Sequence, residues 1–163
     1  GGYVVRVRDS VLFDLGKAEV RAEGKRVLQD VAADIKANPY KTVYVRGHTD
    51  SLPVSRPETK ARFPHGNLQL SAARAIEVAA ILTDEAGVDR SSVVVMGFGP
   101  NDPVAANDTA ENRQRNRRVD IFVDETITIV IDEVAVVDLV RERLGAQVLT
   151  TIGRAHVQID EAG

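Results

Sequence analysis

Cysteine is absent from this sequence of 163 residues. Its absence excludes disulfides, zinc sites built from thiolates and cysteine nucleophiles. Cysteine-free domains occur in the cytosol and in the bacterial periplasm, so the compartment stays open at this point. No stretch approaches the roughly 18 consecutive apolar residues of a membrane span, and no basic segment followed by an apolar run begins the chain. We therefore expect either a soluble chain or one whose targeting segment precedes Gly1.

Hydrophobic residues make up 44% of the chain and charged residues 28%, which is typical of a globular domain. Charge is unevenly distributed. Residues 1–124 contain 18 basic and 17 acidic residues, whereas residues 125–163 contain 3 and 7. This difference predicts two units, a main domain over 1–124 and an extension over 125–163.

The first half of the chain alternates between strand and helix patterns. Residues 3–7 alternate and are rich in valine, 11–13 form a second short apolar stretch, and 42–46 are a β-prone run that ends at Gly47. Apolar residues recur at helical steps over 20–35, and Asn38-Pro39 ends that helix because proline has no amide donor. The strand over 42–46 therefore delivers the residues after Gly47 at its C-terminal end.

The second half continues the alternation after a long loop, 51–66, which has three prolines, one glycine and no sustained periodicity. Ser71 is predicted to cap a helix whose buried stripe is Ala75, Val78, Ala79 and Leu82, with Gly87 as its left-handed cap. A strand over 92–96, a short helix started by Asn107, Asp108 and Thr109, and a strand over 118–123 follow. This order predicts an α+β fold, an α/β sandwich in which the helices pack on one face of a mixed sheet.

Two charged residues are placed to meet at one end of that sheet. Asp50 follows a strand end, and Arg74 lies near the start of a helix that returns to the same sheet. A carboxylate binds an ammonium through charge-assisted hydrogen bonds, and a guanidinium fork binds a carboxylate through two parallel ones. The pair therefore suits a ligand that carries both groups, such as the end group of an amino acid. The alternative is that Asp50 and Arg74 form an internal salt bridge with each other.

Several motifs in the correct order resemble the OmpA-like peptidoglycan-binding domain family. They are Gly47-His48-Thr49-Asp50, then Asn67-x-x-Leu70-Ser71-x-x-Arg74-Ala75, then Gly97-Phe98-Gly99, then Asn107-Asp108-Thr109-x-Glu111-x-Arg113-x-x-Asn116-Arg117-Arg118. The resemblance covers roughly residues 3–124. It implies a non-enzymatic module that anchors an envelope protein by holding peptidoglycan non-covalently through the meso-diaminopimelate of the stem peptide. No cofactor and no metal are implied.

The resemblance also implies the roles of individual residues. Asp50 takes the ammonium of the ligand and Arg74 takes the carboxylate. Thr49 and Asn67 contact the ligand or shape its pocket, Asp14 lies on the pocket floor and Arg117 closes the rim. Arg118 is expected to serve structure.

The same resemblance implies a place in the cell. We expect the periplasm or cell envelope of a Gram-negative-type bacterium, with contact to a membrane only through a segment outside these residues. The long loop over 51–66 looks like the MotB subgroup, whose members anchor flagellar stators, although Leu68 stands where that subgroup often has tryptophan. The oligomeric state stays open, a homodimer being one option.

Other functions receive less support from the sequence. His48 and His65 lie near Asp50, but no HExxH pattern is present, so a metal or hydrolytic site is not favoured. His48 is instead expected to be a hydrogen-bonding structural residue at the strand end. Gly97-x-Gly99 is too short for a dinucleotide fingerprint. Four arginines within residues 113–118 suggest a nucleic-acid patch, but the domain is nearly neutral and lacks stacking aromatics. A pair facing solvent and a pair facing the ligand pocket is the simpler interpretation, without nucleic acid.

The extension over 125–163 is predicted to add a strand, a helix and two strands in a hairpin, and its role is not indicated by any catalytic pattern. A second hypothesis for the whole protein is an envelope protein–protein interaction module, stator- or secretion-related, whose pocket is vestigial or occupied by a side chain.

Overall fold

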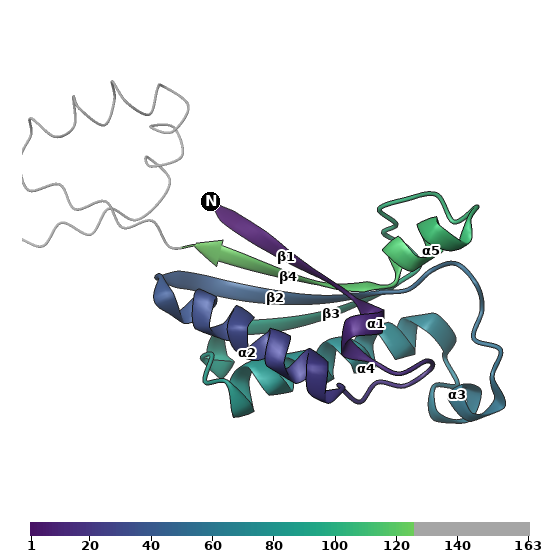
Figure 1. Cartoon of the computed structure of the whole chain (residues 1–163), viewed down its shortest axis with the longest axis horizontal. Helices are drawn as coiled ribbons and strands as arrows, with labels where there is room; N and C mark the ends of the chain where they lie inside the picture. The colour runs from purple at the N-terminus through teal and green to yellow at the C-terminus, as the bar shows by residue number, and fades with distance from the viewer. Residues whose placement is uncertain (126–163) are drawn as a thin grey trace, which may run out of the picture. The chain divides into compact units, whose positions relative to one another are not determined.

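The computed structural model describes residues 1–125, which form one four-stranded sheet with helices (Figure 1). The strands are β1 (Gly2–Arg8), β2 (Tyr40–His48), β3 (Val93–Gly99) and β4 (Arg118–Glu125). Their order across the sheet is β1-β4-β2-β3. β2 and β3 are parallel, whereas β4 is antiparallel to both β1 and β2. The mixed sheet expected from the sequence is therefore confirmed.

Two long helices, α2 (Ala22–Ala37) and α4 (Gly66–Ala80), cover one face of this sheet (Figure 1). A π-helical turn, Ile81–Glu85, continues α4, and a 3-10 turn, Arg90–Ser92, precedes β3. The core between sheet and helices is aliphatic. It includes the fully buried side chains of Leu12, Leu28, Ile35, Val43, Val45, Val78, Leu82, Val119, Ile121 and Val123. None of the helices among residues 1–125 is long and apolar enough to cross a membrane.

Three short helices lie at the ends of the longer elements: α1 (Asp9–Leu12), α3 (Pro57–Arg62) and α5 (Ala110–Asn116). The expected helix after Asn107 is confirmed as α5, and Thr109 Oγ1 caps it by accepting the Asn112 amide at 3.1 Å. One expectation was wrong: the 51–66 segment is not all loop, because α3 lies within it. Val11 and Leu12 of the short apolar stretch belong to α1. Proline at the first position of α3 supplies a backbone angle suited to a helix start.

The start of α4 also differs from the expectation. Ser71 does not cap this helix, which begins five residues earlier at Gly66. Gly66 has a φ of 70°, and the Gln69 side chain accepts the His65 amide at 2.9 Å, so the first turn is supported without a serine cap. Ser71 is instead buried within the helix, where its hydroxyl accepts the Gly99 amide at 2.9 Å and donates to the Leu68 carbonyl at 2.8 Å.

Close approach of α4 to the sheet depends on two glycines that face it. A Cβ atom on Gly47 of β2 would collide with the Ser71 carbonyl, and one on Gly97 of β3 would lie 2.7 Å from the Ala72 Cβ. Because both positions lack a side chain, α4 lies directly on the C-terminal ends of the parallel strands. This contact brings Arg74 to the sheet end that carries Asp50. The predicted strand, helix and hairpin of 125–163 lie outside the described residues apart from Glu125.

Candidate functional site

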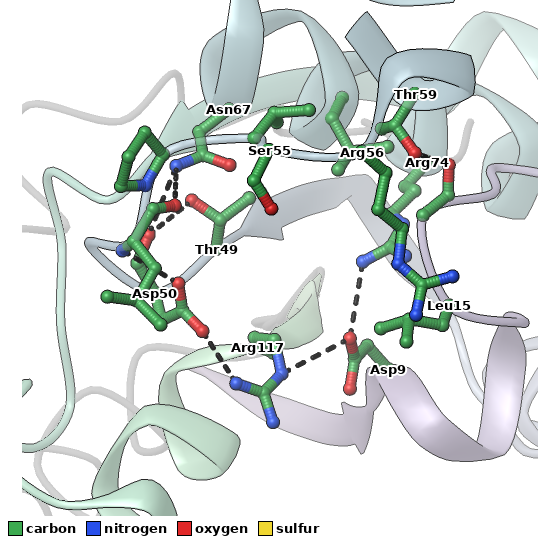
Figure 2. A pocket seen from close by; sticks show the side chains of 15 residues that line it. Asp9, Leu15, Thr49, Asp50, Ser55, Arg56, Thr59, Asn67, Arg74 and Arg117 are labelled. Atoms are coloured by element: carbon green, nitrogen blue, oxygen red, sulfur yellow. Dashed lines mark hydrogen bonds and ion pairs between the residues drawn. The ribbon is translucent and has the colours of Figure 1, made fainter.

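A cavity of about 310 Å³ opens at the C-terminal end of β2 (Figure 2). Its walls come from six parts of the chain, namely the start of α1, the segment after α1, the turn after β2, the 52–56 loop with α3, helix α4, and the residue before β4. The side chains or backbones that line it include Asp9, Gly16, Thr49, Asp50, Ser55, Arg56, Thr59, Asn67, Leu70, Arg74 and Arg117. Charged and polar groups therefore converge from elements that are far apart in sequence.

Asp50 forms one end of the charged lining. It is 7% exposed, although it lies in the turn directly after β2. Its Oδ1 accepts the Leu52 amide at 2.9 Å, and its Oδ2 accepts a hydrogen bond from Arg117 Nη1 at 2.6 Å. The bond from the Leu52 amide fixes the carboxylate in one orientation. Aspartate side chains in turns commonly accept such a bond from the amide two residues further along the chain.

Arg74 forms the other end. It is 4% exposed, its Nε donates to the Lys17 carbonyl at 2.9 Å, and its guanidinium carbon lies 4.7 Å from the centre of the Phe13 ring. Its Nη1 donates to Asp9 Oδ2 at 3.3 Å. Burial lowers the pKa of Arg74 from its ordinary value, while Asp9 opposes that shift. The guanidinium is thus held rigidly from one side, and its edge faces the cavity (Figure 2).

Asp9 is a site residue that the sequence did not reveal. Its Oδ2 lies 3.3 Å from Arg74 Nη1 and 3.7 Å from Arg117 Nε, so it joins the two guanidiniums. Burial raises the pKa of Asp9, and the two arginines oppose the rise. Asp14, which was expected on the pocket floor, does not line the cavity. Its side chain is 62% exposed and lies 3.5 Å from Arg21 Nε.

Four side chains thus form a chain of alternating charge along the cavity: Asp50, Arg117, Asp9 and Arg74 (Figure 2). Asp50 and Arg74 occupy its two ends and each contacts an inner member. The direct salt bridge between them, which the sequence left open, is not among the ion pairs of residues 1–125. The network is neutral as a whole, with a carboxylate at one end and a guanidinium at the other. Such an arrangement is complementary to a zwitterion.

The other residues that were predicted from the sequence hold this network of four charged side chains in place. Asn67 Nδ2 donates to the Leu52 carbonyl at 2.8 Å and to the Asp50 carbonyl at 3.4 Å, which fixes the turn after β2 to the start of α4. Thr49 Oγ1 donates to the Asp50 carbonyl at 2.9 Å. Arg117 directly follows α5, whose last residue Asn116 is fully buried and bonded to Val104, Ala105 and Asn107.

The wall formed by the 52–56 loop and α3 contributes residues that no motif indicated. Arg56 is exposed and lines the same cavity as Arg74 (Figure 2). Thr59 is buried, and its hydroxyl donates to the Gly16 carbonyl at 3.3 Å. That bond ties α3 to the segment after α1. Pro57, the first residue of α3, was the available sequence signal for this wall.

The arginine cluster is divided by the fold. Arg117 alone of the four lines this cavity, so the expected pair facing the pocket was wrong. Arg113 Nη1 donates to the Asn107 carbonyl at 3.2 Å. Arg115 and Arg118 line a different cavity together with Arg6, Arg8 and Val104. Extended residues alternate between faces, which separates Arg117 from Arg118.

His48 is buried beneath the site and not part of it. Its ring stacks on Phe98 with centroids 4.9 Å apart, and neither ring nitrogen has a hydrogen-bond partner among residues 1–125. Burial, with Arg118 as the next cause, lowers the pKa of His48 to about 4. The expectation of a hydrogen-bonding histidine was therefore wrong. Residues 1–125 contain no group of three or more side chains suited to hold a metal ion.

Comparison with known proteins agrees with this arrangement. The sequence profile of the OmpA family matches residues 12–117, which is more than half of the chain. This chain belongs to the OmpA family. The matched span contains Asp50, Arg74 and Arg117, whereas Asp9 lies just before it.

Relatives of this OmpA-family domain occur in larger proteins. The chain is 32% identical over 122 residues to motility protein B of Bacillus subtilis (strain 168), covering 75% of this chain and 45% of that protein. It is 38% identical over 121 residues to outer membrane porin F of Pseudomonas aeruginosa, covering 74% and 32%. The chain thus spans about half or less of the length of these curated relatives.

Solved structures of related domains have the same fold. The cell wall anchor of the T6SS from Pseudomonas aeruginosa has a TM-score of 0.67 and 37% identity, covering 76% of this chain and 81% of that one. The periplasmic domain of Helicobacter pylori MotB has a TM-score of 0.65 and 23% identity, covering 88% and 93%, and shares the fold.

Proposed function

We propose that this domain binds peptidoglycan non-covalently and anchors the protein that carries it to the cell wall. The similarity to a cell wall anchor at 37% identity supports this function, as does membership of the OmpA family. The observation that carries the proposal is the cavity in which Asp50 and Arg74 stand at opposite ends of one neutral charge chain. We place the domain in the periplasm or cell envelope, as in the periplasmic domain of MotB.

Within the wall polymer, we assign the meso-diaminopimelate of the stem peptide to this cavity. The side chain of diaminopimelate ends in an ammonium and a carboxylate on one carbon, which is the amino-acid end group. The ammonium pairs with Asp50 and the carboxylate with the free edge of Arg74. Each of these charge-assisted hydrogen bonds contributes about 1.5–3 kcal/mol before the cost of ordering is subtracted.

The four-membered network favours a zwitterion over a singly charged ligand. A lone cation would leave Arg74 with no charged partner besides Asp9, and a lone anion would leave Asp50 with no charged partner besides Arg117. Because the cavity is open and its ligand is small, single-site affinity is modest. Anchoring then depends on the many repeats of the polymer.

Sedimentation of the pure domain with isolated sacculi tests this function. We expect the parent domain to sediment with sacculi and Asp50→Asn, which keeps the side-chain shape and the Leu52 contact, to stay in the supernatant. Asp30→Asn is the matched control, because Asp30 is exposed on α2 away from the cavity. A parent domain that does not sediment would refute wall binding and favour the protein–protein interaction module.

A further inference from the structure

A second cavity, of about 290 Å³, lies beside β1, β4 and α5, and four of its five lining residues are arginines. They are Arg6 and Arg8 of β1, Arg118 of β4 and Arg115 of α5, and the fifth residue is Val104. Strand pairing places Arg6 opposite Asp120 and Arg8 opposite Arg118. The core residues Val7 and Val119 pair between them, so these charged residues lie on the face of the sheet opposite α2 and α4.

The charge at this cavity is only partly compensated. Asp120 accepts hydrogen bonds from Arg6 Nε at 2.9 Å and from Arg118 Nε at 3.0 Å. Asp102 Oδ2 lies 3.9 Å from Arg118 Nη2. Within residues 1–125, Arg8 and Arg115 form no ion pair and no side-chain hydrogen bond. Four guanidiniums therefore face two carboxylates, which leaves two positive charges.

This excess positive charge is held in place by the fold. Arg118 has a side chain that is only 2% exposed, and it donates to the carbonyls of Asn116 at 3.3 Å and Asp102 at 3.1 Å. It therefore cannot turn away from Arg8, which faces it across the strand pair. Like charges directly opposite each other on neighbouring strands are destabilising. A bound anion in the cavity would offset that repulsion.

We propose that this cavity binds a phosphate group, either free phosphate or a phosphate monoester. A phosphate monoester carries about −1.5 to −2 charges at neutral pH and three strong acceptor oxygens, which matches the two uncompensated charges. A carboxylate brings one charge and two oxygens in one plane. Guanidiniums that approach from two strands and a helix suit a tetrahedral group, and those of Arg8 and Arg115, which have no side-chain partner among residues 1–125, can each form two parallel hydrogen bonds to it.

The phosphate site is independent of the wall-binding cavity. It uses Arg115 and Arg118, whereas the wall-binding cavity uses Arg117, and it lies on the other face of the sheet. Its success or failure therefore says nothing about Asp50 and Arg74. Sacculus sedimentation should be the same for a variant without this site as for the parent.

Titration with inorganic phosphate tests the site. The chemical shifts of the backbone amides are measured by NMR, and a titration with sodium chloride at equal ionic strength is the control. We expect saturable shifts at residues 8, 104, 115 and 118. The double variant Arg8→Gln/Arg115→Gln removes the two unpaired, exposed arginines and should weaken phosphate binding about tenfold or more. Arg26→Gln, which removes an exposed arginine from α2, should bind phosphate like the parent.

Shifts that do not saturate, or that are the same in the double variant as in the parent, would overturn the site. Vesicles of phosphatidylcholine with and without phosphatidic acid then distinguish the sources of phosphate. Sedimentation with phosphatidic acid that is lost in the double variant identifies a lipid headgroup, while phosphate titration without vesicle binding identifies a soluble phosphate.

Discussion

Arg117 donates a hydrogen bond of 2.6 Å from Nη1 to Oδ2 of Asp50. The carboxylate that we assign to the ligand ammonium is thus already held by a guanidinium, and its other oxygen holds the Leu52 amide. The ligand ammonium therefore binds a carboxylate that already accepts hydrogen bonds from Arg117 and from the Leu52 amide. This sharing orients the carboxylate beforehand, and it also limits the affinity of one site.

Asp9 supports this arrangement, because it joins Arg74 to Arg117. We expect Asp9→Asn to weaken binding to sacculi severalfold, since Arg74 loses its charged partner and Arg117 keeps only Asp50. Asp14→Asn should bind like the parent, because Asp14 is exposed and outside the cavity. Sedimentation with sacculi at several domain concentrations measures both. The reverse result would restore Asp14 as the floor residue and remove Asp9 from the site.

Arg56 is predicted to contribute to the carboxylate end of the ligand. It lines the same cavity as Arg74 and has no ion-pair partner among residues 1–125. Arg56→Gln should therefore weaken binding of a diaminopimelate stem peptide by about threefold to tenfold, as expected for a solvated charge-assisted hydrogen bond. Lys60→Gln, an exposed position on α3, is the control and should have no effect. Equal affinities of the Arg56 variant and parent in an NMR titration would exclude this role.

The helices and strands with a clear hydrophobic period could be predicted from the sequence. The convergence of Asp50 and Arg74 at one end of the sheet could be predicted as well. Helix α2 and its end at Asn38-Pro39, the strands and the capped α5 all follow from local patterns. α1 could not be predicted in this way, because four residues are too few to show a helical period. Asp9, the first residue of α1, was missed for a related reason. Asp9 reaches Arg117 across the sheet, and no local pattern records such a contact.

The start of α4 was misplaced because serine is a frequent cap and Ser71 precedes an apolar stripe. The competing signals were Gly66, with its positive φ, and Gln69. Ser71 instead serves the contact between α4 and β3, where its hydroxyl satisfies the Gly99 amide. The phosphate cavity was likewise hidden, because Arg6 and Arg8 meet Arg115 and Arg118 only after β1 pairs with β4.

The lowered pKa of His48 predicts how the free energy of unfolding depends on pH. Its pKa in the folded protein is about 4 against an ordinary value of 6.5, because burial and the nearby Arg118 and Arg46 outweigh Asp120 and Asp102. The unfolded chain therefore takes up a proton between these values while the folded protein does not. Stability should fall as pH falls from 6.5 to about 4, by about 3 kcal/mol, and this contribution should be constant below that.

Urea denaturation at about pH 7 and about pH 4.5 measures this effect in the parent and in His48→Phe. The variant keeps a ring to stack on Phe98 and cannot titrate. Carboxylates such as Asp120 contribute to both curves, so the difference between them isolates His48. An identical pH dependence in the two proteins would mean that His48 is not held neutral by the fold.

The central claim is that Arg74 binds the carboxylate of the ligand end group while Asp50 binds the ammonium. The most direct test is the affinity of parent and Arg74→Gln for two stem-peptide fragments, one with diaminopimelate and one with lysine, which lacks the second carboxylate. The parent should prefer diaminopimelate by about tenfold or more, and Arg74→Gln, with its fold verified by NMR, should bind both about equally. A preference that survives in Arg74→Gln, or a parent that does not discriminate, would contradict the account.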